Sequence, residues 1–268
     1  RDRSVSRGLG DVYKRQALRE VFEETGVKKI PVLDDEGKNL ILRKIAGNYE
    51  DKLTVLKGNI KKLGYISEVK SVISEFTQYD IGEEELDDMI DSLDEESRLY
   101  YKLKDIRLLY DGFQDYLRER YITKEELLDV LSREVRESEL LKNSTVVLDG
   151  FTGFTPVQNR LILELMKYCK GVWITVIMDE RENPYSYRHP YQLFGLSKQM
   201  VTTLISLARE EHIAVEEPVC LYGYPVKRFE KNKELAFLER NIFRYGAGTY
   251  EKEAVSYTHL RAHETLSD

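Results

Sequence analysis

Two aspartates come directly after apolar runs of the sequence, where a carboxylate could hold a metal ion. Asp149 follows the run 145–148, and Asp179 follows the run 172–178. Ligands of open parallel sheets bind beyond the carboxyl ends of the strands, so both aspartates would face one site. A carboxylate in this position holds the magnesium of bound ATP in nucleotide-hydrolysing enzymes, while an acidic neighbour activates the attacking water. Here the neighbour of Asp149 is Gly150, so a turn-capping role for Asp149 stays equally open.

The elements expected to position these aspartates alternate between strand and helix. The runs 145–148 and 172–178 are rich in β-branched residues and predict parallel strands that are buried on both faces. Residues 156–168 have helical spacing and begin with a proline, which the first turn of a helix tolerates. Strand, helix and strand of these lengths predict a βαβ unit. A helix over residues 192–211 and a third strand near 215–221 would continue the alternation.

The first half of the chain is predicted to be helical. From Ala17 to about Leu140 the apolar residues recur every three or four positions, which lays a stripe along one helix face. Thr123 and Glu126 have the spacing of a capping box, so a helix is expected to begin there. The acidic run 83–94 is interpreted as a solvated helix or a linker and not as a metal site. The predicted fold class is therefore α/β, with a helical subdomain before a parallel-sheet core.

Composition limits the classes of protein that the chain could belong to. Its 268 residues are 41% hydrophobic, enough for the core of one large domain or two small ones. The net charge of -7 argues against a protein that coats nucleic acid indiscriminately, although Lys57, Lys61 and Lys62 could form a local basic patch or a solvated helix face. No run approaches the roughly 20 apolar residues of a membrane helix, so we expect no membrane association and a cytoplasmic location. Cys169 and Cys220 lack further ligands at metal spacing, so we predict no metal site and two free, buried thiols.

The two ends of the chain resemble translated sequencing-adaptor read-through. Residues 1–16 and 255–268 share no periodicity with their neighbours. On this interpretation both ends are artefacts, and both natural termini are expected to be missing. The predicted organisation is a helical subdomain over residues 17–142, an α/β core over 143–245 and a tail over 246–268.

The segment TVVLDGFTGFTPVQ, residues 145–158, resembles a motif of superfamily-one DNA helicases in which apolar residues precede D-E-F-Q-D-T-N-x-x-Q. The register fits without a gap. Asp149 matches the magnesium aspartate, Phe151 the aromatic residue and Gln158 the final glutamine, whereas Gly150 replaces the catalytic glutamate. The resemblance implies an incomplete P-loop helicase-like core that keeps the shape of a nucleotide site and has lost its hydrolytic group.

A second resemblance follows one strand later. The segment VIMDERENPY, residues 176–185, resembles the next helicase motif, apolar-x-D-x-x-Q-S-I-Y, and retains Asp179 and Tyr185. Glu182 stands where a glutamine would sense the terminal phosphate, and a carboxylate there would repel phosphate. Tyr185 could stack on DNA bases, and Arg181 and Arg188 could contact phosphates. Core packing for the tyrosine and an ordinary surface position for the arginines stay open as alternatives.

With YDGFQDYLRERYITKEELLDVL and DGFTGFTPVQNRLILELM, these motifs make the chain similar to the amino-terminal half of the B subunit (AddB/RexB type) of the bacterial AddAB (RexAB) ATP-dependent helicase-nuclease. The likeness covers nearly all of residues 17–245. In that family, the B subunit pairs with an active A subunit in double-strand break resection for recombinational repair, and its inactivated helicase part is a DNA-binding scaffold. The resemblance implies two partners, DNA and the A subunit. Mg-ATP stays open as a ligand, although no phosphate-loop motif is present here, and the four-cysteine iron-sulfur cluster of the family lies outside this fragment.

Three functions stay open on the sequence. The first is a fragment of a non-motor, helicase-like subunit that holds DNA and contacts its partner. The second is an active DNA-dependent ATPase or helicase in which Glu180 or Glu182 supplies the base from the neighbouring strand. The third is a structural α/β adaptor without a ligand. No catalytic residue is assigned, and enzymatic activity of the fragment alone is left undecided.

Overall fold

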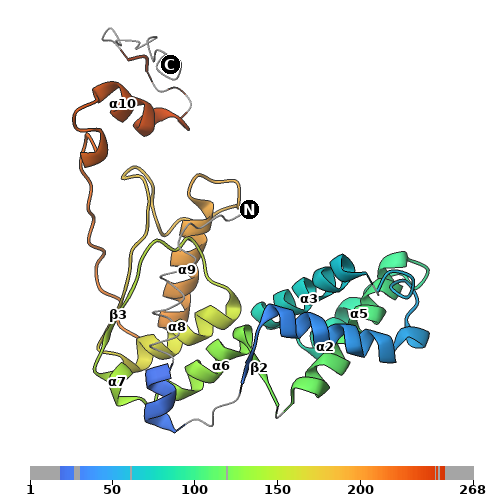
Figure 1. Cartoon of the computed structure of the whole chain (residues 1–268). Helices are drawn as coiled ribbons and strands as arrows, with labels where there is room; N and C mark the ends of the chain where they lie inside the picture. The colour runs from blue at the N-terminus through green and yellow to red at the C-terminus, as the bar shows by residue number, and fades with distance from the viewer. Residues whose placement is uncertain are drawn as a thin grey trace, which may run out of the picture.

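A computed structural model of the chain describes residues 19–26, 31–60, 62–118, 120–244, 246 and 248–250. The adaptor-like segments 1–16 and 255–268 lie outside the described residues. Figure 1 shows two lobes side by side: a helical lobe over residues 34–118, and an α/β lobe that contains the longer strands. The predicted α/β class, a helical part with a parallel-sheet part, is confirmed.

The helical lobe is a group of helices around one apolar core. The core includes Leu42, Leu56, Leu109 and Phe113, all almost fully buried. The acidic run predicted as a solvated helix or linker forms a helix, which turns Leu86 and Ile90 inward. The elements of the lobe are α2 (Asp35–Asn48), the 3-10 turn η1 (Glu50–Lys52), α3 (Leu63–Gln78), α4 (Glu83–Asp91) and α5 (Arg98–Leu117).

A glycine allows α2 and α5 to approach closely. A Cβ atom at Gly112 would lie 2.8 Å from Cγ2 of Ile45 and 2.6 Å from Cε2 of Tyr49, which is nearer than atoms can pack. Because the Ile45 methyl branches from a stiff β-carbon, α2 would have to move to admit a larger side chain. Gly112 therefore fixes the spacing of these two helices.

A buried carboxylate in α5 holds the loop that follows η1. Asp105 is 3% exposed, and its two oxygens accept hydrogen bonds from the backbone amides of Thr54, Val55 and Leu56 at 2.7–3.0 Å. These amides belong to no regular helix or strand, so without Asp105 the buried amide of Leu56 would lose its partner. One side chain thereby orders the whole turn between η1 and α3.

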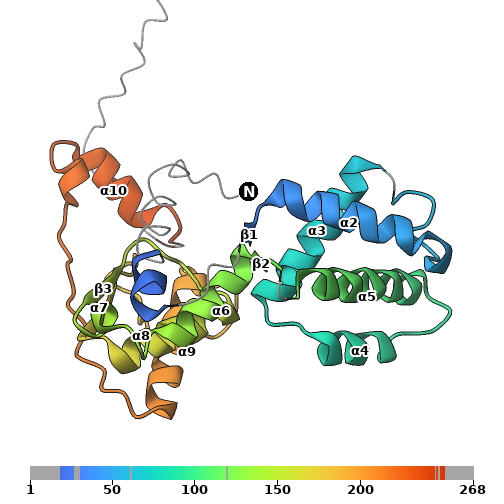
Figure 2. The same cartoon turned by 60° about the horizontal axis from the view of Figure 1, so that its bottom comes forward.

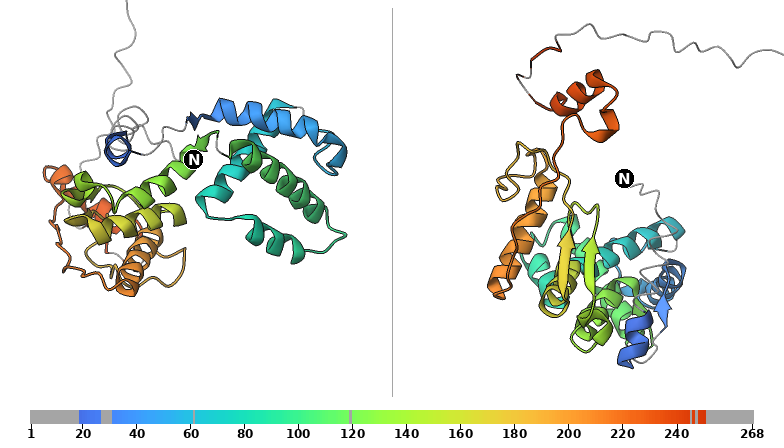
Figure 3. Two further views of the ribbon diagram at one scale, coloured as in Figure 1. Left: turned by 90° about the horizontal axis from the view of Figure 1, so that it is seen from below. Right: turned by 90° about the vertical axis from the view of Figure 1, so that its left-hand side faces the viewer.

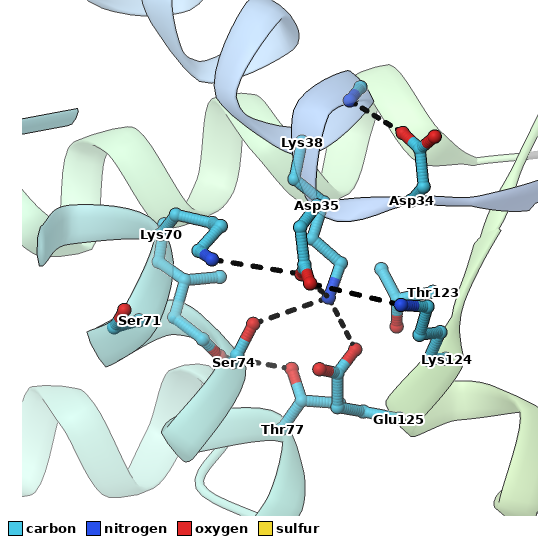
Figure 4. A network of polar contacts seen from close by, with 12 residues as sticks. Asp34, Asp35, Lys38, Lys70, Ser71, Ser74, Thr77, Thr123, Lys124 and Glu125 are labelled. Carbon is cyan, nitrogen blue, oxygen red and sulfur yellow. Dashed lines mark hydrogen bonds and ion pairs between the residues drawn. The ribbon is translucent and has the colours of Figure 1, made fainter. Parts of the chain in front are cut away.

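The chain passes between the lobes twice, and the two passages pair with each other. The short strands β1 (Val32–Leu33) and β2 (Ile122–Thr123) form a parallel pair. Beside them the buried ammonium of Lys38 in α2 meets a carboxylate oxygen of Glu125 at 2.6 Å and the Ser74 hydroxyl of α3 at 3.3 Å. Figure 4 shows how these side chains converge from the blue, teal and green segments. The joint between the lobes is thus both a backbone pairing and a buried ion pair.

The α/β lobe begins with a capped helix and contains the predicted βαβ unit. The Thr123–Glu126 and Thr155–Gln158 capping boxes are both formed. The helix predicted over residues 156–168 is found with those bounds, and the two strands pair in parallel. The elements are α6 (Lys124–Glu134), α7 (Glu139–Lys142), β3 (Thr145–Leu148), α8 (Pro156–Tyr168), β4 (Gly171–Ile174) and α9 (Gly195–Glu210), followed by η2 (Lys227–Phe229) and α10 (Lys233–Asn241).

Helices α6 and α7 lie in the α/β lobe, because both pack against α8. The segment 19–25 also belongs there, since Glu24 accepts hydrogen bonds from the Ser138 hydroxyl and from the backbone amide of Leu140. The helical lobe is therefore inserted between this segment and α6, as Figures 1 and 2 show. These contacts favour a domain division near Thr123 over the predicted one at residues 142–143, and the division stays a proposal.

The sheet differs from the prediction in three respects. Strand β4 stops at Ile174, because β3 turns away after Leu148 and offers no further partner. Among the described residues, elements cover only one face of the sheet, where α8 and α9 pack on the side of Leu148 and Ile174. Val147 and Trp173 on the other face are 62% and 54% exposed, so the prediction of burial on both faces was wrong. Residues 215–221 are extended but unpaired, so the third strand is absent from the described residues. Figure 3 shows the two strands side by side.

Two predictions from composition have different outcomes. Among the described residues, no helix is long and apolar enough to cross a membrane. Both cysteines are free, as predicted, but only Cys169 is partly buried, and this burial raises the pKa of its thiol. Cys220 is exposed because it lies in the extended segment after α9, which corrects the prediction of two buried thiols.

Substitution of Asp105 tests the buried amide turn. Asp105→Ala is expected to lower the free energy of unfolding by about 3 kcal/mol, since a buried amide left without a partner costs about 1–3 kcal/mol and two more amides lose theirs. Urea unfolding followed by circular dichroism measures this change. Asp115→Ala on the same helix is the control, because Asp115 is 70% exposed. Equal stability of the two variants would contradict the assignment.

Candidate functional site at the strand ends

The first predicted site residue, Asp149, lies directly after β3 and is bonded to the neighbouring strand. Its Oδ1 accepts a hydrogen bond from the hydroxyl of Thr175, which follows β4. The same hydroxyl oxygen accepts a hydrogen bond from the backbone amide of Gly150 at 3.2 Å. Asp149 thus joins the carboxyl ends of the two strands.

Gly150 occupies the position of the catalytic glutamate of the helicase motif. Its backbone has a conformation that residues with a side chain rarely adopt. Its φ is +78°, in the left-handed region. No atom lies within 4 Å of where a Cβ would be, so space alone would admit a side chain. The backbone conformation, however, favours glycine over any L-residue with a side chain. The turn after Asp149 is therefore built for glycine.

Gln158, the final glutamine of the motif, is part of a helix cap. Its side-chain oxygen accepts a hydrogen bond from the backbone amide of Thr155 at 2.9 Å. In return, the Thr155 hydroxyl accepts from the Gln158 amide at 3.4 Å. This capping box starts α8 and satisfies two backbone donors. The side-chain oxygen of Gln158 thus has a structural partner.

Asp179, in the loop after β4, is enclosed by arginines. Arg181 donates to both of its carboxylate oxygens, at 2.8 Å from Nε and 2.6 Å from Nη2, and also through its backbone amide. Nη2 of Arg244 lies 3.3 Å from Oδ2. The hydrogen bonds from Arg181 hold the pKa of Asp179 far below its usual value. Asp179 is consequently ionised at every ordinary pH, and its negative charge is balanced by the arginines.

Glu182 is paired with a buried lysine. Its side chain is 12% exposed, and its Oε2 contacts Nζ of Lys198 in the first turn of α9, whose side chain is 2% exposed. Its other oxygen lies 2.6 Å from Nη1 of Arg244. The hydrogen bond from Lys198, with that from Arg244, lowers the pKa of Glu182. The carboxylate that would repel phosphate is thus bound internally.

A distant segment supplies the remaining partner of this loop. Arg240 in α10 contacts the Glu180 carboxylate, and its backbone carbonyl accepts a hydrogen bond from Arg181. The Arg240 guanidinium also lies 4.6 Å from the ring centroid of Tyr224. Helix α10 is reached by an extended segment along the outside of the α/β lobe, as Figure 1 shows. Arginines from this segment therefore fasten it to the loop after β4.

The predicted DNA contacts lie in and beyond the same loop. Tyr185 is 50% exposed. Arg188 lies at the surface, and among the described residues no carboxylate pairs with its guanidinium. Arg181 is paired with Asp179, so its guanidinium is less available than that of Arg188 for a contact with a DNA phosphate. Gly195 keeps the loop close to α9, because a Cβ there would lie 2.8 Å from the carbonyl oxygen of Pro190.

The sequence prediction missed the residues that neutralise the loop. Lys198 carried a signal, since a cation in the first turn of a helix opposes the helix dipole and calls for an acidic partner. Arg240 and Arg244 are four residues apart, a spacing that would place two side chains on one helix face, although α10 ends at Asn241 and Arg244 lies beyond it. Thr175 is the polar residue within an apolar run. The place where these residues meet could not be read from the sequence, because Lys198 and Arg240 meet their partners 16 and 60 residues away along the chain.

The loop after β4 carries a set of carboxylates that are satisfied by the protein itself. Three carboxylates of the loop face three arginines and one lysine. Within the part of the chain that the structure describes, no group of three or more potential metal ligands gathers. Such a site stabilises a loop and offers no free general base.

Comparisons with known proteins were consistent. A family model described as ADDB, N-terminal, matches residues 13–239. The ATP-dependent helicase/deoxyribonuclease B subunit of Lachnoclostridium phytofermentans is 38% identical over 248 residues, which cover 90% of this chain and 21% of that protein. The proteins of the same name from Thermoanaerobacter sp. and Clostridium acetobutylicum are 31% and 30% identical, covering 96% and 94% of this chain.

These matches also bear on the extent of the chain. It spans 21–22% of the length of these relatives. The alignment with the Thermoanaerobacter protein covers 96% of the chain and therefore reaches into both end segments. The interpretation of those segments as adaptor sequence stays a prediction.

Glu182→Gln tests the buried ion pair. The variant is expected to lose about 3 kcal/mol of stability at neutral pH, because it leaves Lys198 buried without a counter-charge. The pKa of Glu182 is lowered in the folded state, so the pair stabilises above the usual value of 4.5 and this contribution is lost as the pH falls. The difference between parent and variant should therefore shrink below about pH 4.

Unfolding is followed by the fluorescence of Trp173, the single tryptophan, which lies on β4. Glu180→Gln is the control, because its pair with Arg240 is more than one-third exposed and such pairs are worth under about 1 kcal/mol. A stability difference that is independent of pH would contradict the ion-pair explanation.

Proposed function

This chain belongs to the ADDB, N-terminal, family, and on that premise we propose that it is part of a non-motor B subunit that holds DNA within a helicase-nuclease. In this proposal, the whole protein pairs with the A subunit in the resection of double-strand breaks for recombinational repair in the cytoplasm. The fragment contributes a scaffold and not hydrolysis. The relatives carry the name of an ATP-dependent helicase/deoxyribonuclease, which supports the setting of this role.

The observation that carries the proposal is the internal bonding of the carboxylates in the loop after β4, together with Gly150 in place of the motif's glutamate. Asp179 and Glu182 are held by arginines and Lys198, whereas Asp149 is exposed and uses one oxygen to accept from Thr175. A magnesium ion bound to ATP needs a carboxylate that is free to face it. We infer that Asp179 and Glu182 do not fit Mg-ATP, and we assign no step of catalysis to these residues or to Asp149.

The alternative of an active ATPase is less well supported. It requires Glu180 or Glu182 as the base that activates water. A base must accept a proton, but Glu182 has a lowered pKa and is paired with Lys198, while Glu180 is paired with Arg240. At the other candidate position, the left-handed backbone of Gly150 disfavours a glutamate. The ion pairs of Glu180 and Glu182 and the backbone of Gly150 therefore support a structural role for this region.

A DNA-binding and hydrolysis experiment tests the proposal. The 268-residue chain is expected to bind a labelled single-stranded oligonucleotide in the absence of nucleotide. Addition of Mg-ATP should leave this affinity unchanged and should release no phosphate above background. Replacing Tyr185 and Arg188 by alanine should weaken binding by about thirtyfold or more, since a stacked base and a phosphate contact are each worth about 1–3 kcal/mol. Fluorescence anisotropy and phosphate release are the measurements.

The control is Asp149→Asn, which should leave DNA affinity unchanged. DNA-stimulated ATP hydrolysis that this substitution abolishes would establish the active enzyme instead. A chain that binds no DNA at all would leave the structural adaptor.

A further inference from the structure

A strip of cations and tyrosine rings runs along the seam between α2 and α5, on the helical lobe. Nζ of Lys44 and the guanidinium of Arg120 lie over the ring of Tyr116, at 5.3 and 5.1 Å from its centroid. Nζ of Lys52 lies 5.3 Å from the ring centroid of Tyr49. The cations are exposed, whereas both rings are partly buried against the core of the lobe. We call these five residues the cationic strip.

The rings are held at a fixed spacing by the close approach of the two helices. Tyr49 packs where Gly112 has no side chain, and Tyr116 follows Gly112 by one turn of α5. Gly112 and Tyr116 are thus about 6 Å apart along the axis of α5. Each ring fixes the cations above it by cation–π attraction, which reduces the freedom that they would lose on binding a ligand.

The cations of the strip have no carboxylate partners. Within the described ranges, no acidic side chain pairs with Lys44, Lys52 or Arg120. Several other arginines of the chain are paired, for example Arg107 with Glu83 and Asp87, and Arg160 with Asp80. In a chain with a net charge of -7, three unpaired cations on one seam form a local positive surface. The residues earlier considered for a basic patch differ, since Lys57 pairs with Asp51 and Lys61 lies outside the described residues.

We propose that the cationic strip binds the phosphate backbone of a DNA strand. A guanidinium stacked on a ring keeps its N–H edge free, and that edge matches two phosphate oxygens. The ammonium groups of Lys44 and Lys52 supply point charges on the same seam, as phosphate-binding surfaces require. The site lies on the helical lobe and is separate from the loop of Tyr185. It rests on the proposed function only for the identity of the anionic partner.

The experiment compares two triple variants with equal change of charge. Lys44→Gln/Lys52→Gln/Arg120→Gln removes the cations of the strip. Arg133→Gln/Arg136→Gln/Lys142→Gln, the control, removes cations of the α/β lobe that are each paired with a carboxylate.

Binding of a labelled single-stranded oligonucleotide is measured by anisotropy across a range of potassium chloride concentrations, and circular dichroism checks the fold. The strip variant is expected to lower the slope of log affinity against log salt by about 2, since each phosphate contact on a single strand contributes about 0.7. The control variant should keep the slope of the parent.

Each other outcome overturns the proposal in a distinguishable way. If the parent binds DNA and the strip variant keeps its affinity and slope, the strip is not the site and the proposed function stands. If the parent binds no DNA, both fail. If both triple variants weaken binding equally, only net charge matters. If polyglutamate displaces the oligonucleotide from the parent as well as unlabelled DNA does, the strip fits an acidic protein instead.

Discussion

The relative placement of the two lobes depends on the burial of one lysine. Lys38 is 1% exposed, and burying an ammonium group is costly unless an opposite charge is at hand. Glu125 supplies that charge from the first turn of α6, and Ser74 supplies a further acceptor from α3. Three helices of two lobes must meet for this cation to be satisfied. The ion pair lies beside the β1–β2 strand pair, where the chain passes between the lobes. It therefore restricts rotation of the helical lobe relative to the α/β lobe.

A second buried lysine–carboxylate pair occurs in the α/β lobe, where it has another consequence. Lys198 is as deeply buried as Lys38 and is satisfied by Glu182. In the joint, the ion pair connects two lobes; at the strand ends, it removes a carboxylate from the place where a nucleotide would need polar ligands. Arg244 adds a second link by contacting both Glu182 and Asp179. The loop is thus stabilised by the charges that would have made it reactive.

Local patterns in the sequence predicted the fold well, whereas contacts between distant segments were not predictable. The capping box at Thr123 and the helix from Pro156 depend on residues three or four apart, and both are found. The partners of Lys38 and Lys198 depend on tertiary packing, which no local pattern records. The apolar run at β3 correctly predicted a strand, but its covering on both faces required a layer that the described residues do not form over Val147.

The motif resemblance selected residues whose backbone positions suit the motif, while their role as a nucleotide site stays a prediction. Asp149 lies at a strand end, as the register of the motif required, yet its carboxylate is used to join two strands. Gln158 matches a nucleotide-contacting glutamine, yet its oxygen closes a helix cap. Both residues would be retained by the needs of folding alone, since a turn and a cap are wanted whether or not a nucleotide binds. A matched motif therefore indicates shared architecture here, and a free functional group is the observation that would indicate shared catalysis.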